Sequence, residues 1–274
     1  MGNLEGKVAF VTGAARGQGR SHAVRLAREG ADIIAVDVCR QLETVPYPMA
    51  TPEDLAETVS QVEALDRRIA AVQADVRDTK ALGAAVRDGV AELGSVDIVL
   101  ANAGILQVSA SEAVDPDAVF REVIEVNLTG VWNTVHVSAP IMIEQGRGGA
   151  IVLTSSTQGL TGRGGDGGPE MSGYCAAKHG VVGLMRSFAN WLAPHNIRVN
   201  TVHPTGVNTD MIMNEAVGAA MAARPEAAGA LTNLMPVDMV EPIDISNAIA
   251  WLVSDAARYV TGVTLPVDAG FCVK

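Results

Sequence analysis

Short apolar runs rich in β-branched residues alternate along the chain with longer segments in which apolar residues recur every three or four positions. The first pattern is typical of strands buried on both faces, and the second of helices that cover them. Right-handed crossovers between such strands build a doubly wound, mostly parallel sheet. We therefore expect one α/β domain over residues 1–274, with helices on both faces of seven strands: Val8–Val11, Ile33–Val36, Ile69–Val72, Ile98–Leu100, Ile151–Leu153, Val199–Val202 and Val263–Val267.

The charge and composition of the chain disfavour nucleic acids and membranes as binding partners. The chain has 31 Asp and Glu against 20 Lys and Arg, a formal charge of −11, whereas nucleic acids and anionic membranes select basic surfaces. Hydrophobic residues make up 48% of the chain and charged residues 19%, which is typical of a packed domain. The first residues lack a secretory signal pattern, and no apolar run reaches the roughly 18 residues that a membrane span requires. We expect a cytoplasmic protein that binds neither nucleic acid nor membrane.

Cysteine and histidine spacing gives no sign of a disulfide framework or a metal site. The three cysteines are odd in number and form no CxxC pair: Cys39, Cys175 and Cys272. Four histidines lack ligand spacing with acidic residues or Cys: His22, His136, His179 and His195. We expect no metal, and we interpret Cys175 as a small helix residue rather than a nucleophile.

Two segments interrupt the alternation of strand and helix. The first, Cys39–Pro52, carries three prolines where a direct turn from the second strand into the next helix would suffice. The second, Thr161–Pro169, reads TGRGGDGGP and is rich enough in glycine to form a mobile lid. Long loops in compact domains tend to be functional or disordered. A tolerated surface insertion is the alternative for both.

A glycine-rich turn follows the first predicted strand. Gly13 permits a tight turn, Gly17 lets the backbone approach a pyrophosphate, and Gly19 allows close packing of helix on strand. A helix expected to begin near Gln18 would offer its free N–H groups to the phosphates. Asp37, at the end of the second strand, is placed to accept hydrogen bonds from an adenosine ribose. The alternative is a plain strand-to-helix turn with an exposed Asp37.

Asp37 also bears on which dinucleotide binds. At an effective dielectric near 20, a carboxylate about 5 Å from a 2′-phosphate meets a repulsion of roughly 3 kcal/mol per charge pair. Hydrogen bonds to a free 2′-hydroxyl would instead contribute about 1.5–3 kcal/mol. Arg16 could pair with a 2′-phosphate, but Asp37 itself could neutralise it. We predict NAD over NADP.

At this point the sequence resembles the short-chain dehydrogenase/reductase family, which has a Rossmann fold, over essentially its whole length. The shared motifs are TGAARGQG at residues 12–19, Asp75-Val76, Asn102-Ala103-Gly104, Asn127 in EVNLTG, Ser156, Tyr174 and Lys178 in YCAAK, Pro204 in HPTG, Val207 with Thr209, and the last-strand motifs YVTG and VDAG. The resemblance implies a cofactor site formed by Gly13, Arg16, Gly17, Gln18, Gly19, Asp37, Asp75, Val76, Asn102, Ala103, Gly104, Tyr174, Lys178, Pro204, Val207 and Thr209. It implies a catalytic set of Asn127, Ser156, Tyr174 and Lys178.

A narrower resemblance is to carveol-dehydrogenase-like, mycofactocin-coupled members of the family. It rests on GAARGQGRSHA, on the insertion at about 39–53, and on VHPTGVNTDMI. In those relatives the insertion is thought to cover NAD, which exchanges poorly and is regenerated by an external redox carrier. The resemblance also implies a homotetramer.

Tyr174 and Lys178 are four residues apart, and therefore share one face of a predicted helix. A free tyrosine has a pKa of about 10, too high for a base at neutral pH. A cation about 4 Å away favours the phenolate by up to roughly 4 kcal/mol, or about three pKa units. We expect Lys178 to lower the pKa of Tyr174, which would act as general base in alcohol oxidation and general acid in carbonyl reduction.

Ser156 is expected to hydrogen-bond the substrate oxygen and stabilise its developing charge. Ser155 is the rival for this role, and we prefer Ser156 because relatives place the serine just before a short xxG segment. The resemblance implies that Asn127 holds a water on a relay from Lys178 to solvent. His203, before Pro204, is interpreted as a structural histidine, with a substrate or cofactor contact as the alternative.

A flap at about 207–240 is expected to cover the substrate. Five of the ten methionines lie between Asp210 and Val240, and flexible thioethers suit an adaptable apolar pocket. We therefore expect NAD-linked oxidation of a hydrophobic secondary alcohol, terpenoid- or steroid-like, or reduction of the matching ketone. Packing of the flap or of a subunit interface is the alternative for these methionines. An NADP-linked carbonyl reductase and a non-catalytic dinucleotide-binding regulator are the other functions considered.

Overall fold

The computed structural model describes residues 2–107, 115–165 and 167–274. Its centre is a sheet of seven parallel strands in the order β3-β2-β1-β4-β5-β6-β7. The strands are β1 Val8–Thr12, β2 Asp32–Asp37, β3 Ile69–Gln73, β4 Ile98–Ala101, β5 Gly149–Thr154, β6 Ile197–Pro204 and β7 Thr264–Val267. The predicted doubly wound α/β sheet is confirmed, and every predicted strand is present with its ends shifted by two residues or fewer.

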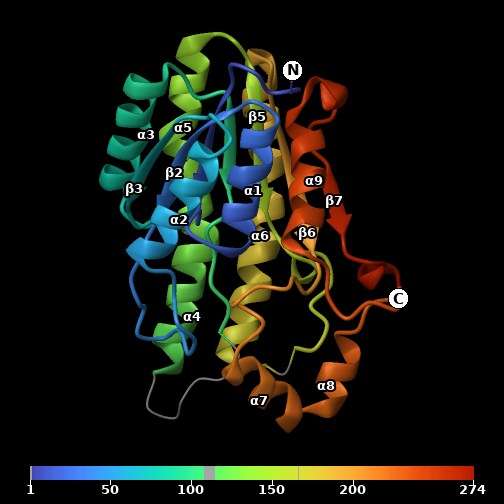
Figure 1. The fold of residues 1–274 in the computed structure, drawn as a ribbon. Coiled ribbons are helices and arrows are strands. Elements are labelled where there is room, and N and C mark those ends of the chain that lie inside the picture. The colour runs from blue at the N-terminus through green and yellow to red at the C-terminus, as the bar shows by residue number, and fades with distance from the viewer. Residues whose placement is uncertain (1, 108–114, 166) are drawn as a thin grey trace.

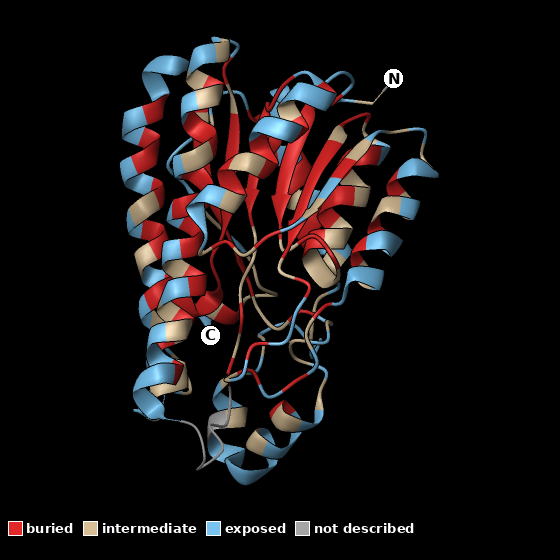
Figure 2. Ribbon diagram, turned by 90° about the vertical axis from the view of Figure 1, so that its left-hand side faces the viewer, coloured by how far each residue is buried: buried red, intermediate tan, exposed pale blue. Residues whose placement is uncertain are grey.

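Helices cover both faces of the sheet, because alternate strand residues point to opposite sides. Ala9 and Ile33 pack toward helices α1 (Gly17–Arg28), α2 (Pro52–Glu63) and α9 (Pro242–Val253). Phe10 and Ile34 pack toward the other face, which is covered by α3 (Thr79–Leu93), α5 (Gly130–Gln145) and α6 (Pro169–Leu192). Figure 2 shows the result: central strands buried throughout, and helices buried along the side that meets them.

Three further helices gather beyond the carboxyl ends of the strands. They are α4 (Pro116–Ile124), α7 (Glu215–Ala223) and α8 (Pro225–Ala230). In Figure 1 they lie at the lower end of the molecule, below the sheet. Strands β1 to β3 are added toward one edge of the sheet and strands β4 to β7 toward the other, so the strand order switches between β1 and β4. Open parallel sheets bind ligands in the crevice at such a switch point. We therefore expect the ligand site at the carboxyl ends of the strands.

The insertion after β2 is packed and internally hydrogen-bonded. Leu42, Val45 and Tyr47 are buried in a small apolar cluster that also contains Val76, Ile105, Val123 and Val126. The Gln41 side chain donates to three backbone carbonyls of the same loop. Pro52 is the first residue of α2, and the side chain of Thr51 caps the start of this helix. It is thus an ordered layer over the strand ends.

The glycine-rich segment after β5 is anchored to the far end of the chain. Arg163 donates to the carbonyl oxygens of Phe271 and Lys274, and its guanidinium lies 5.2 Å from the centre of the Phe271 ring. Asp166 lies outside the described residues. A lid role for Thr161–Pro169 stays a prediction. None of the described helices combines the length and the apolar character that crossing a membrane requires.

Candidate active site

A cleft lies at the carboxyl ends of β1, β2 and β4. Twelve of the residues predicted to hold a cofactor line it: Gly13, Arg16, Gly17, Gln18, Gly19, Asp37, Asp75, Val76, Asn102, Ala103, Gly104 and Thr209. Sequence reasoning did not assign the others: Val38, Leu42, Tyr47, Met49, Ala50, Ala74, Ile105, Val126, Asp210 and Met211. Four of these ten belong to the insertion, which the resemblance had placed over NAD as a segment, and Asp210 and Met211 belong to the predicted flap.

The glycine turn is built as the sequence predicts. Gly13 has φ +68° and Gly17 has φ +55°, a conformation that side chains disfavour. At Gly19 an added Cβ would lie 1.8 Å from the carbonyl oxygen of Gly13. Helix α1 can therefore approach β1 this closely only because position 19 has no side chain.

The turn fits the pyrophosphate of a dinucleotide. Within the described chain, no side chain caps α1, whose N-cap is Arg16, so its first N–H groups remain available to an anion. The buried Oε1 of Gln18, which lines the cleft, has no hydrogen-bond partner among the described residues. Buried polar atoms without a partner are rare. An amide oxygen only accepts, so it calls for a donor on the ligand such as a hydroxyl, whereas the free N–H groups suit the phosphates.

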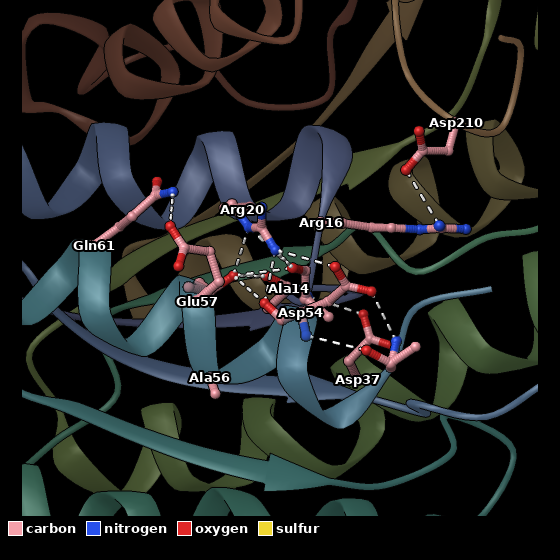
Figure 3. A network of polar contacts seen from close by, with 12 residues as sticks. Ala14, Arg16, Arg20, Asp37, Asp54, Ala56, Glu57, Gln61 and Asp210 are labelled. Atoms are coloured by element: carbon pink, nitrogen blue, oxygen red, sulfur yellow. Dashed lines mark hydrogen bonds and ion pairs between the residues drawn. The ribbon is translucent and has the colours of Figure 1, made fainter. Parts of the chain in front are cut away.

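Asp37 lines the cleft next to the glycine turn, and Figure 3 shows its contacts. Its carboxylate accepts hydrogen bonds from the backbone N–H groups of Ala15 (3.0 Å) and Cys39 (3.2 Å). Each carboxylate oxygen can accept more than one hydrogen bond, so both remain able to bind a ribose hydroxyl. Asp37 is nearly buried, which fixes the position of its negative charge.

The expectation that Asp37 neutralises Arg16 is wrong. Arg16 instead pairs with Asp210 (3.2 Å) and donates to the carbonyl oxygen of Pro48 in the insertion. In Figure 3 the Arg16 side chain points away from Asp37 toward Asp210. Because Asp210 comes from the segment after β6, this partner was not visible in the local sequence. The negative charge of Asp37 is therefore left to act on the ligand.

Asp75 also lines the cleft, and its carboxylate belongs to a network of ion pairs. Arg77 donates to both of its carboxylate oxygens, and Arg40 of the insertion donates to one of them at 2.9 Å. Burial pushes the pKa of Asp75 upward, but the hydrogen bonds and charge of Arg77 outweigh it and hold that pKa below its usual value. Arg77 also reaches Glu122 of α4, which accepts a hydrogen bond from Thr44 of the insertion.

The two candidate serines after β5 differ in their contacts. Ser155 Oγ donates to the backbone carbonyl of Lys178 at 2.9 Å and is buried. Ser156 Oγ accepts from the N–H of Gln158 at 3.1 Å, and its hydroxyl faces the Tyr174 phenol, whose pKa it lowers. Ser156 is therefore the serine that the structure brings to the tyrosine.

Lys178 lies one helical turn beyond Tyr174 on α6. Its ammonium donates to the carbonyl oxygen of Thr154 (2.9 Å) and lies 5.5 Å from the centre of the Tyr174 ring. Burial lowers the pKa of Lys178 to about 8. Burial also raises the pKa of Tyr174 to about 12, against a smaller lowering by the Ser156 hydroxyl. The expectation that Lys178 lowers the pKa of Tyr174 is wrong for the chain alone, because the Coulomb argument omitted the cost of burying the phenolate.

Asn127 is fully buried in a π-helical turn, Glu125–Thr129, between α4 and α5. Its side-chain amide exchanges two hydrogen bonds, both 2.8 Å, with the backbone of Ile105. An added Cβ at Gly104 would lie 3.1 Å from Asn127 Oδ1 and 3.7 Å from Lys178 Nζ. The side chain thus fixes the loop after β4 beside Lys178. A water relay through Asn127 stays a prediction.

His203 is fully buried, and both of its ring nitrogens are hydrogen-bonded. The interpretation as a structural histidine agrees with this, and the alternative of a direct substrate contact is wrong for a side chain with no exposed surface. Pro204 and Val207 are also buried and do not belong to the cleft lining, whereas Thr209 does. The roles predicted for Pro204 and Val207 stay predictions.

Cys175 follows Tyr174 directly but does not have the properties of a nucleophile. Burial raises the pKa of the Cys175 thiol, which disfavours the reactive thiolate. Among the described residues, no three His, Cys, Asp or Glu side chains are grouped as metal ligands.

These motifs and this geometry define the class of protein. A sequence model of the short chain dehydrogenase family matches residues 7–219, and the chain belongs to the short-chain dehydrogenase/reductase family. It is 58% identical over 272 residues to an uncharacterized oxidoreductase of Mycobacterium tuberculosis, covering 99% of this chain and 98% of that protein.

Two relatives carry more specific names. (−)-trans-Carveol dehydrogenase of Rhodococcus erythropolis is 49% identical over 282 residues, with 100% of both chains covered. The crystal structure of carveol dehydrogenase from Mycobacterium avium in complex with NAD superimposes with a TM-score of 0.91 at 51% identity, again over 100% of both chains. The predicted family and its carveol-dehydrogenase-like character are thus confirmed.

Proposed function

We propose that the protein is an NAD-dependent dehydrogenase that oxidises a hydrophobic secondary alcohol, terpenoid- or steroid-like, or reduces the matching ketone. The observation that carries the proposal is the grouping of Ser156, Tyr174 and Lys178 next to Gly104, which lines the same cleft as Asp37. The relatives named carveol dehydrogenase, one of them solved with NAD, support the same assignment.

The residues have separate tasks in this proposal. Ser156 hydrogen-bonds the substrate oxygen, and Tyr174 takes the hydroxyl proton in oxidation or gives it back in reduction. Lys178, held at the Thr154 carbonyl, places positive charge beside the phenol, and Asn127 holds the loop that borders both. NAD, when bound, supplies the hydride acceptor for the alcohol carbon.

Asp37 is the basis for proposing NAD rather than NADP. Its carboxylate accepts two backbone hydrogen bonds, and Arg16 is engaged elsewhere, with Asp210 and Pro48. A 2′-phosphate would meet the charge of Asp37 while Arg16 would have to leave its partners. An NADP-linked reductase is correspondingly disfavoured. The assembled Ser156–Tyr174 pair also argues against a non-catalytic regulator.

Methionines after β6 support an apolar substrate. Met211 packs at the cleft against the cluster that contains Tyr47, whereas Met213, Met221 and Met235 are exposed on the segment that carries α7 and α8. We assign residues of about 207–240 as the substrate flap and about 39–53 as the insertion over the cofactor. A cytoplasmic homotetramer, with NAD regenerated by an external redox carrier, belongs to the same proposal.

The proposal is tested by two measurements on the purified protein. Mass spectrometry of the material released on denaturation identifies any cofactor that co-purifies, and the proposal expects NAD. Titration calorimetry then compares NAD with NADP, and comparable affinities would overturn the assignment to NAD. Rates with carveol, cyclohexanol and a sugar alcohol test the substrate class, and a preference for the sugar alcohol would contradict it.

A further inference from the structure

His203 connects the strand β6 to the residue on which the proposed chemistry depends. Its Nδ1 lies 2.8 Å from the carbonyl oxygen of Ser156, and its Nε2 lies 2.8 Å from Thr201 Oγ1. The side chain is fully buried. No motif assigned a role to this residue.

The partners of the ring define its protonation. A carbonyl oxygen only accepts, so the proton must be on Nδ1, and Nε2 of the neutral ring then accepts from the Thr201 hydroxyl. Burial lowers the pKa of His203 to about 4, although the Ser156 hydrogen bond opposes this. Of the charged groups that face the ring, Lys178 and His179 of α6 also lower this pKa, and Asp268 after β7 raises it. The ring is therefore neutral at neutral pH, with one tautomer that satisfies both contacts.

The contact with Ser156 lies where the β5–β6 ladder stops. The last paired residues are Thr154 and Val202, and the final backbone hydrogen bond runs from Ser155 N–H to the Val202 carbonyl at 2.9 Å. Beyond it the chain leaves β5, with Ser156 still extended at φ −168° and ψ 164°. Beyond this last backbone bond, the His203 side chain makes the next hydrogen bond between the two strands, to the carbonyl oxygen of Ser156.

Ser156 is thereby fixed from two sides. Its carbonyl oxygen also accepts from the N–H of Gly159 (2.9 Å), and its Oγ accepts from the N–H of Gln158 (3.1 Å). These two hydrogen bonds lie within the short turn and do not attach the Ser156 peptide to the sheet. The hydrogen bond from β6 attaches that peptide to the sheet.

We infer that His203 is a positioning residue, which holds the Ser156 peptide so that its hydroxyl points at Tyr174 and at the substrate oxygen. This inference rests on the proposed function, because it requires Ser156 to act on the substrate. His203 does not touch the substrate. It acts only through Ser156.

The test compares variants at position 203 that keep or remove a donor near Nδ1. We expect His203→Leu to lower kcat by about 10- to 100-fold, the range for a small misplacement of a catalytic group, with KM and NAD affinity changed less than about threefold. In His203→Asn the introduced amide nitrogen can reach the same carbonyl, so this variant should recover kcat to within about threefold of wild type. His203→Gln places its amide further out and should not. If the leucine variant does not fold, the His203→Asn and His203→Gln variants decide, with His203→Asn expected at least about fivefold faster.

Asn200→Leu is the matched control. Asn200 is also buried on β6, but its amide bonds the backbone of Val260 and Val263 rather than Ser156. It should lose thermal stability as His203→Leu does, yet keep wild-type kcat. Equal loss of kcat in the two variants would overturn the inference, as would wild-type kcat in His203→Leu or equal loss in His203→Asn and His203→Gln.

A parallel series in Ser156→Ala separates this inference from the proposed function. Since His203 acts through Ser156, adding His203→Leu to Ser156→Ala should change kcat by less than about twofold. A further drop of the same size as in the wild-type background would overturn the role of His203. Full activity in Ser156→Ala would instead overturn the proposed role of Ser156 and, with it, the inference.

Discussion

The cofactor end of the site, which is the cleft lined by Asp37 and Asp75, and its catalytic end, which is the neighbouring group of Ser156, Tyr174 and Lys178, differ in how they hold charge. At the cofactor end, ionisable groups are held in their charged forms by close partners, and the hydrogen bonds of Arg77 keep the pKa of Asp75 below its usual value despite burial. At the catalytic end, burial drives Tyr174 and Lys178 toward their neutral forms, with pKa values of about 12 and about 8.

The difference matches two physical tasks. Binding an adenosine ribose needs an acceptor held in one place, and two backbone N–H groups hold the Asp37 carboxylate there. Moving a proton needs groups whose charged and neutral forms are close enough in free energy to exchange. Lys178, with a pKa of about 8, meets this condition in the chain alone. Tyr174, with a pKa of about 12, needs positive charge beside it, and low-dielectric surroundings make such a charge act more strongly. The site thus combines residues that bind the cofactor through fixed hydrogen bonds with residues on which charge changes during reaction.

The largest effect is expected at the catalytic end. Tyr174→Phe removes the only group placed to exchange the substrate proton among the described residues, so kcat should fall by about 10³-fold. The fold and the cofactor end do not depend on this hydroxyl, and NAD affinity by calorimetry should remain within about threefold of wild type. Retention of more than about a tenth of wild-type kcat would mean that another group carries the proton.

The two serines offer a matched pair. Ser156→Ala should lower kcat by about 10²-fold, since it removes a hydrogen bond to the developing charge. Ser155→Ala removes only the buried bond to the Lys178 carbonyl, and should mainly lower the free energy of unfolding by about 1 kcal/mol. Steady-state rates and thermal unfolding of both variants distinguish the two. The reverse pattern would move the catalytic assignment to Ser155.

The cofactor end should respond in affinity rather than in turnover. Asp37→Asn removes a charge-assisted hydrogen bond, and NAD affinity should fall by about 10- to 100-fold. Asp32→Asn is the control, because Asp32 begins the same strand but pairs with Arg68 away from the cleft. Calorimetry should find its NAD affinity unchanged. Equal losses in both variants would show that strand stability, and not Asp37, sets affinity.

The pH dependence of the rate tests the protonation state of Tyr174. Because burial raises the pKa of Tyr174 to about 12, the phenolate is scarce at neutral pH and its fraction grows with each pH unit. Initial rates of alcohol oxidation at low substrate should therefore rise between about pH 6 and 8, by up to about tenfold per unit. Ketone reduction uses the phenol and should not rise. A flat oxidation profile would mean that proton removal is not limiting.

The sequence predicted the features that depend on local patterns and missed those that depend on contacts between distant segments. The strands and the glycine turn depend on local patterns, and the conformation of Gly13 and the tight contact at Gly19 agree with what those patterns require. The partner of Arg16 could not be predicted, because Asp210 lies 194 positions away and reaches it only through the fold. The cleft residues of the insertion, such as Tyr47, carry no motif.

The pKa of Tyr174 is the second failure, and its cause is physical. Spacing on one helix correctly placed Lys178 near the phenol, 5.5 Å from its ring centre. Burial, which depends on every element packed around the site, then reversed the direction of the shift. The role of His203 was missed for the same reason: its contact with Ser156 spans 47 positions.

A single-turnover experiment tests the central claim most directly. Wild type, Asp37→Asn and Tyr174→Phe are each saturated with NAD and mixed with excess carveol, and the near-ultraviolet absorbance of reduced nicotinamide is followed. Wild type and Asp37→Asn should both form one equivalent at rates within about threefold of each other, and Tyr174→Phe should be about 10³-fold slower. Equal rates in Tyr174→Phe and wild type, or no reduced nicotinamide in wild type, would contradict the account.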